Sequence, residues 1–309
     1  MDLNNVFISR HDASSLVQTA ERDGFPSTCC AWIKGIYGVL STLQVREVIG
    51  VVRGDCSQTQ GLLEILQMEG IKVFPFSYPY DRARSAMGEE LAKMRKHFQV
   101  DTEAIEATRE HLSRIRVKLK HLDTLTWKEN RVSGEENKSF LLASSDMKGD
   151  PFQFETELDH FLDLVSHRTS LAEKNEIRLG VLGVPPIWTD FYKKIERKGV
   201  RVVFNEVPRQ FSMPITDLDL AGQYLAYTYP YDVFFRLEDI QNECTRRDVD
   251  GVIHYVQSFC FRQIEDKILR KCVPLPILTL EGDRPEPIDM RTEVRLEAFL
   301  EMLARNKVS

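Results

Sequence analysis

Cysteines that stand where a helix begins are the residues of this 309-residue chain best suited to chemistry. Cys260 follows an apolar run, opened by Asp250 and Gly251, that predicts a buried strand, and the charge and leucine spacing of residues 261–271 predict a helix after it. In a parallel sheet such a turn lies at the carboxyl edge, where ligands bind. The partial positive charge of a helix N-terminus also favours thiolate, the form that binds metals and attacks electrophiles.

A second segment repeats this arrangement around Cys56. A β-branched run predicts a strand over 48–53, a turn over 54–57, a helix over 58–67 and a returning strand over 71–76. Further upstream, Ser27 or Thr28 can cap a helix that begins at Cys29 and Cys30. Either cysteine of that pair is also explained as a small buried residue at a helix start. Cysteines in matching positions of two βαβ units indicate the alternative, a shared ligand role.

The elements that must position these thiols form two α/β regions and a helical one. Residues 85–173 carry apolar side chains at three- and four-residue steps amid dense charge, which predicts amphipathic helices. Residues 132–149 are polar and predict a surface connection. We therefore expect an α/β protein with two Rossmann-like parallel-sheet domains, 1–84 and 174–309, separated by a helical segment over 85–173.

In the second α/β region, strands are expected over 178–183, 200–205 and 276–280, and helices over 187–198, 237–247 and 292–305. The aromatic and proline-rich residues 207–231 predict a long loop that could line a cleft. The turn after the first of these strands has no G-x-G-x-x-G pattern, so the dinucleotide fingerprint is absent.

Composition narrows the function classes. The formal charge of −6 and the lack of a basic stripe give no reason to expect nucleic acid as a partner. No apolar run approaches the roughly 20 residues that cross a bilayer, and the first residues lack the features of a secretory signal, so we expect a cytoplasmic protein without membrane contact. Six cysteines in such a protein favour buried thiols, metal ligands or a reactive thiol over a disulfide framework.

In the order of these features the chain resembles the 2-hydroxyacyl-CoA dehydratase D-component family, which includes 2-hydroxyglutaryl-CoA dehydratase and subunits of the ATP-dependent benzoyl-CoA reductases. The resemblance runs from about residue 25 to the end, and three cysteines occur in matching contexts and in the matching order. The matching stretches are 30–38 (CAWIKGIYG), 54–60 (GDCSQTQ), 182–186 (LGVPP), 250–253 with 259–260, 276–278 with Glu281 and Asp283, and 295–299.

The resemblance implies a [4Fe-4S] cluster in the cleft between the two α/β domains, ligated by Cys30, Cys56 and Cys260, with Cys29 as the alternative to Cys30. Thiolates are the usual ligands of iron–sulfur clusters. It further implies that an ATP-dependent iron–sulfur activator protein delivers one low-potential electron, which turns an acyl-CoA thioester into a ketyl radical for dehydration or reduction. The partner chain would be a second copy or a related subunit.

Two alternatives stay open within the resemblance. A related branch of homodimers carries a double-cubane [8Fe-9S] cluster and reduces small molecules, and a non-catalytic subunit or scaffold of the same family is also possible. His254 and Asp283 are candidates for proton transfer because both lie near the carboxyl edge of the second sheet. His254 falls inside a predicted strand, however, and Asp283 is equally explained as a residue that fixes a turn.

Overall fold

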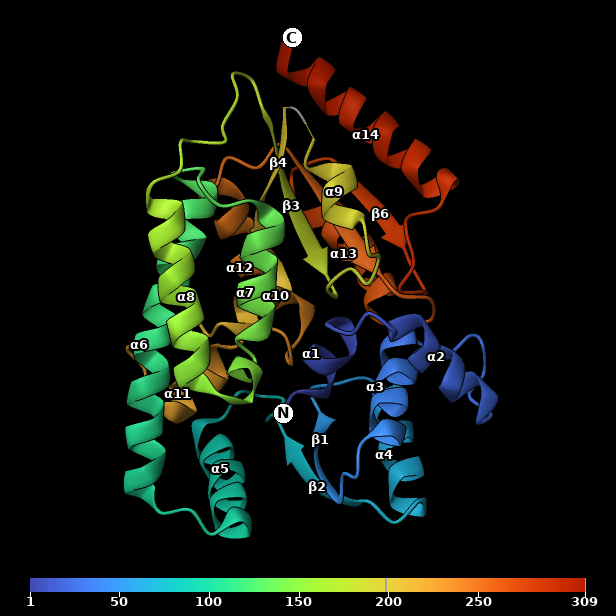
Figure 1. The fold of residues 1–309 in the computed structure, drawn as a ribbon, viewed down its shortest axis with the longest axis vertical. Helices are drawn as coiled ribbons and strands as arrows, with labels where there is room; N and C mark the ends of the chain where they lie inside the picture. The colour runs from blue at the N-terminus through green and yellow to red at the C-terminus, as the bar shows by residue number, and fades with distance from the viewer. Residues whose placement is uncertain (198, 309) are drawn as a thin grey trace.

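The computed structural model describes residues 1–197 and 199–308, and it confirms a mixed α/β fold with two parallel sheets (Figure 1). The larger sheet has the order β4-β3-β5-β6, and the smaller sheet pairs β1 with β2. Their bounds are β1 (Glu47–Arg53), β2 (Lys72–Ser77), β3 (Ile177–Gly183), β4 (Val200–Asn205), β5 (Gly251–Val256) and β6 (Ile277–Glu281). In Figure 1, β3 and β6 point toward the small sheet and β2 points back, so the carboxyl edges of the two sheets face the region between them.

The larger sheet is covered on both faces, as parallel sheets require. One face packs against α12 (Val233–Arg246) and α13 (Arg262–Cys272), and the other against α9 (Phe191–Ile195) and α14 (Met290–Val308). Every residue of β4 and β5 is buried. The helix expected over 187–198 is reduced to the short α9, and Lys198 lies outside the described residues.

The N-terminal helices join the two sheets through a shared core. They are α1 (Leu3–Ile8), α2 (Ala13–Arg22) and α3 (Ala31–Thr42), and α4 (Ser57–Met68) is the crossover between β1 and β2. Phe7 and Trp32 belong to the same hydrophobic cluster as Val181 and Ile253 of the larger sheet, and their rings meet edge to face at 5.5 Å. Residues near the N-terminus are therefore part of the core of the second sheet.

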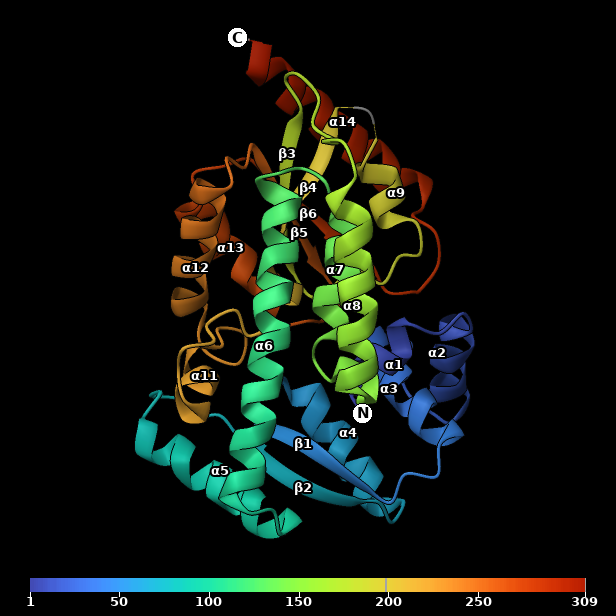
Figure 2. The same cartoon turned by 60° about the vertical axis from the view of Figure 1, so that its left-hand side comes forward.

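The helical segment contains α5 (Arg84–Phe98), α6 (Thr102–Trp127), α7 (Gly134–Ala143), a 3₁₀ turn (Met147–Gly149) and α8 (Pro151–Ser166). Figures 1 and 2 show α6 as a long helix that extends from the level of the larger sheet, where it contacts β4, to the level of the smaller one. The surface connection predicted over 132–149 is wrong because this stretch holds α7. A capping box between Ser133 and Glu136 starts that helix, and Asn137 and Leu141 are buried on its inner face.

The loop predicted over 207–231 is wrong in part, because it contains α10 (Glu206–Phe211) and α11 (Leu220–Ala226). Both helices are too short for a recognisable apolar period. Between them and after them the chain is irregular, and the tyrosines that follow α11 pack against one another.

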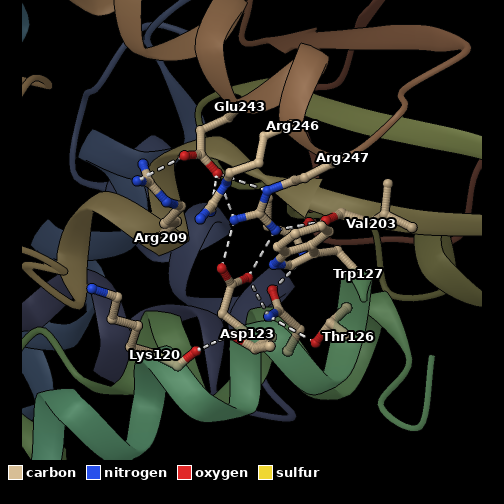
Figure 3. Close-up of polar contacts among 12 residues, drawn as sticks. Lys120, Asp123, Thr126, Trp127, Val203, Arg209, Glu243, Arg246 and Arg247 are labelled. Atoms are coloured by element: carbon tan, nitrogen blue, oxygen red, sulfur yellow. Dashed lines mark hydrogen bonds and ion pairs between the residues drawn. The ribbon is translucent and has the colours of Figure 1, made fainter. Parts of the chain in front are cut away.

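A buried ion pair fastens the helical segment to the larger sheet (Figure 3). Arg247 is fully buried and donates two hydrogen bonds to the Asp123 carboxylate of α6, at 2.9 and 2.5 Å. It also donates to Glu243 at 2.8 Å and to the Val203 carbonyl of β4 at 2.8 Å.

Among the described helices none is long and apolar enough to span a membrane.

Candidate metal centre

Two of the three predicted cysteine ligands are the N-cap residues of helices. Cys30 precedes α3 and Cys56 precedes α4, and neither sulfur caps its helix. N-cap positions normally carry a Ser, Thr, Asp or Asn whose oxygen accepts from the first turn. A cysteine does this poorly. The Cys56 sulfur contacts the Thr59 hydroxyl at 3.5 Å, and both sulfurs lie at the positive end of a helix.

Cys260 lies one residue before the N-cap of α13, at the carboxyl edge of the larger sheet. The preceding residue, Phe259, has a φ of +58°, a conformation that bulky side chains rarely adopt, and its ring is 67% exposed. The Cys260 N–H donates to the Gln257 carbonyl at 3.2 Å and closes the turn. Strained backbone of this kind is typical of functional sites, where the surrounding structure holds it in place.

The structure brings the three cysteines into one electrostatic neighbourhood. The pKa of the Cys30 thiol is raised to about 12, mainly by burial and to a smaller extent by the charges of Cys260 and Cys56, while backbone N–H groups of α3 oppose the shift. Burial also raises the pKa of Cys260, and the charge of Cys56 adds to it. Sulfurs from three separate elements therefore lie within reach of each other's charge. A coordinated metal deprotonates such a thiol outright.

Two glutamines that sequence reasoning missed hold the segment around Cys30. The side-chain oxygen of Gln58, in the first turn of α4, accepts from the Cys30 N–H at 2.8 Å and from the Cys29 thiol at 3.1 Å. Gln257 lies at the end of β5 with its oxygen 4.0 Å from the Cys30 sulfur, and its amide donates to the Tyr255 hydroxyl at 2.7 Å. The Cys29 sulfur is thus already engaged with Gln58, whereas Cys30 faces the turn that carries Cys260.

A buried arginine, Arg262, lies close to Cys260. Arg262, in the first turn of α13, donates to the Tyr229 carbonyl at 2.7 Å and pairs with Glu265 at 3.2 Å. Its guanidinium lies 4.2 Å from the centre of the Tyr229 ring. Glu265 also pairs with the fully buried Arg236 at 2.5 Å, and Arg236 pairs in turn with Glu206. In the sequence, the only feature that singles out Arg262 is its position two residues after Cys260, a candidate ligand.

The donor set consists of thiols alone, and soft thiolates are the usual ligands of iron–sulfur clusters. Among the residues the structure describes, no three His, Cys, Asp or Glu side chains lie close enough to hold one metal ion. Three thiols on three helix starts, with no carboxylate or imidazole among them, match that soft-ligand preference.

The other sequence candidates have structural partners. His254 is fully buried in β5, and its Nδ1 lies 2.9 Å from an Asp266 oxygen, while Nε2 has no partner within the described part of the chain. Asp283 accepts from the N–H and hydroxyl of Ser258, at 2.8 and 2.6 Å, and so fixes the turn after β5. All six cysteines are free; Cys244 and Cys272 pack in the core between the larger sheet and its helices.

Comparison with known proteins agrees with this reading of the fold. No curated protein matches the sequence. A family model described as 2-hydroxyglutaryl-CoA dehydratase, D-component, matches residues 1–303. The match includes α1 and α2, which precede the stretch from about residue 25 that carries the resemblance, and Phe7 of α1 belongs to the core of the larger sheet. The chain therefore belongs to the 2-hydroxyglutaryl-CoA dehydratase D-component family.

Proposed function

We propose that the chain is an iron–sulfur subunit of a 2-hydroxyacyl-CoA dehydratase, a lyase, and that Cys30, Cys56 and Cys260 hold its [4Fe-4S] cluster. The observation that carries the proposal is the gathering of these three thiols, from α3, α4 and the turn before α13, at facing edges of the two sheets. An ATP-dependent activator would deliver a single low-potential electron to the bound cluster. The cluster would pass this electron to an acyl-CoA thioester.

The residues of this chain would orient and shield that chemistry. Gln58 fixes the backbone of Cys30 through its hydrogen bond to the N–H, and Gln257 borders the same sulfur. Arg262 places a buried positive charge beside Cys260, which offsets the negative charge of bound thiolates. Tyr229 covers Arg262 and reduces the access of water from that side. The partner would be a second copy of the chain or a related component, since the family is defined as one component of the dehydratase.

An anaerobic dehydration assay tests the proposal. The purified chain, with its partner component, an ATP-dependent activator and a 2-hydroxyacyl-CoA, should form the unsaturated acyl-CoA only when ATP is present. Cys56→Ser should abolish turnover because oxygen is a poor ligand for iron–sulfur clusters. Cys272→Ser is the matched control, since Cys272 is a half-buried thiol that packs away from the site. Equal activity of Cys56→Ser and the unaltered protein would refute the proposed ligand set.

A further inference from the structure

A separate cavity of about 560 Å³ lies between α6, α11 and the segment that follows α10. Its volume is within the range of pockets that enclose small organic molecules. One wall is apolar and comes from Ile105 and Leu112 of α6 together with Leu220 of α11. The lining also contains the aromatic side chains of Tyr224 and Tyr227. Such a surface favours a ligand with an apolar or planar part.

Charged side chains also line this cavity. Arg109 and Arg116 of α6 line it, and Asp2 is its only acidic lining residue. The Asp2 carboxylate is already engaged, because it accepts from the N–H of Asn4 at 2.9 Å and caps α1. Arg109 is neutralised by an ion pair with Glu106. Arg116 is therefore the arginine of the lining that has no carboxylate partner among the described residues.

Arg116 lacks the partners that a half-buried guanidinium normally has. It forms no ion pair with any described residue, and its one hydrogen bond runs from a terminal nitrogen to the Gln223 side-chain oxygen at 3.2 Å. Its Nε is buried and unpartnered, and so is the amide nitrogen of Gln223, a residue only 2% exposed. Burial lowers the pKa of Arg116, with a further decrease from the charge of Arg109. An arginine that lines a cavity and has no carboxylate partner is suited to pair with an anionic group of a ligand.

The cavity adjoins the metal centre without including its cysteines. Tyr78 lines the cavity, and a Cβ atom on Gly54, in the turn before Cys56, would lie 3.0 Å from the Tyr78 ring. Tyr227 stacks on Tyr229 at 6.3 Å, the residue that covers Arg262. Tyrosine side chains therefore lie between the cavity and the segments that carry Cys56 and Cys260. A ligand in the cavity would be held independently of a bound cluster.

We infer that this cavity binds an organic anion, with a carboxylate or phosphate on the Arg116 guanidinium and an apolar part between Leu112, Tyr224 and Tyr227. The two anionic groups share the chemistry that recognises them, a fork of N–H donors that pairs with two oxygens. The inference rests on the cavity and on Arg116, and it holds whether or not the cysteines ligate iron.

Isothermal titration calorimetry on the full chain without a cluster tests the inference. The probes are 3-phenylpropionate, phenyl phosphate, inorganic phosphate and the uncharged 3-phenylpropanamide. At least one of the two aromatic anions should bind, and the amide should bind at least about tenfold more weakly, because it cannot accept a charge-assisted pair of hydrogen bonds. The tighter of the two anions identifies the carboxylate or the phosphate as the preferred group. Inorganic phosphate should bind more weakly than phenyl phosphate.

Variants connect the binding to the named residues. Arg116→Gln should weaken the preferred anion at least about tenfold, whereas Arg114→Gln, an exposed arginine of the same helix outside the cavity, should leave it unchanged. Thr108→Trp fills the cavity from an exposed position of α6 and should block binding without disturbing the core. Far-UV circular dichroism confirms that each variant is folded. Absence of binding by both aromatic anions, or equal binding by the amide, would overturn the inference.

Discussion

Replacement of Asp123 by Ala should destabilise the protein strongly, because it removes the main counter-charge of a fully buried arginine. Arg247 would lose two hydrogen bonds to the Asp123 carboxylate but keep its bond to Glu243 at 2.8 Å. Breaking a buried pair by removing one partner costs about 3 to 5 kcal/mol, and the remaining carboxylate favours the lower end, about 3 kcal/mol. With a urea m-value of about 3 kcal/mol per M, the unfolding midpoint should fall by about 1 M.

Urea unfolding followed by far-UV circular dichroism measures this shift. The matched control is Asp159→Ala. This change removes a mostly exposed carboxylate of α8 that pairs with Lys118 of α6 at 2.6 Å. Exposed pairs contribute about 0 to 1 kcal/mol, so the control midpoint should move by no more than about 0.3 M. A midpoint for Asp123→Ala that moves no more than the control would refute the view that Asp123 and Arg247 fasten α6 to the larger sheet.

The stabilisation by Asp123 should also depend on pH. Burial alone would raise the pKa of the carboxyl, but the charge and hydrogen bonds of Arg247 outweigh burial and hold the pKa below its ordinary value. A lowered folded-state pKa means that the stabilisation is complete above the ordinary aspartate pKa of about 4 and is lost as the pH falls through the lower folded-state value. The stability difference between the unaltered protein and Asp123→Asn should therefore shrink below about pH 4 and stay constant from about pH 6 to 8.

Two further substitutions test the surroundings of the cysteines and the edge of the larger sheet. Gln58→Leu should speed the loss of iron to a chelator by about tenfold, because the Cys30 backbone loses its hydrogen bond, and an unchanged rate would show that Gln58 does not support a ligand. Gly183→Ala should destabilise by several kcal/mol in thermal unfolding, since its φ is +88° and a Cβ would overlap the Tyr255 carbonyl. Gly88→Ala in α5, with open space around it, should instead stabilise by about 0.5 to 1 kcal/mol.

The strands and the cysteine positions could be predicted because their signals are local. An apolar run bounded by Gly or Asp predicts a strand of a buried parallel sheet, and β1, β2, β3, β4 and β6 each lie within one or two residues of expectation. β5 begins where expected but ends at Val256, before the turn that carries Cys260. The positions of Cys56 and Cys260 follow directly from the strands before them. The same logic found α4 and α13, whose N-termini hold these two cysteines or border them.

Elements whose burial depends on distant partners were missed. α7 is polar along most of its length, and it forms because Asn137 bonds to Asp123 of α6, to Thr126 and to Asn205 of β4, at 2.9 to 3.1 Å. Its capping box at Ser133 and Glu136 was visible in the sequence, but the low hydrophobicity of the stretch outweighed it. Likewise, Gln58 and Arg262 lie near the candidate cysteines only because the starts of α3, α4 and α13 come together in the folded chain. No local sequence pattern predicts this arrangement.

The iron and acid-labile sulfide bound per chain after strictly anaerobic purification test the central claim most directly. The account predicts about four irons per chain, lost in Cys56→Ala and Cys260→Ala and retained in Cys272→Ala, with all three variants folded. About eight irons per chain would indicate the double-cubane [8Fe-9S] cluster instead of a single [4Fe-4S] cluster. A chain that binds no iron, even after anaerobic reconstitution, would contradict the account and leave the three cysteines as structural residues of a non-catalytic family member.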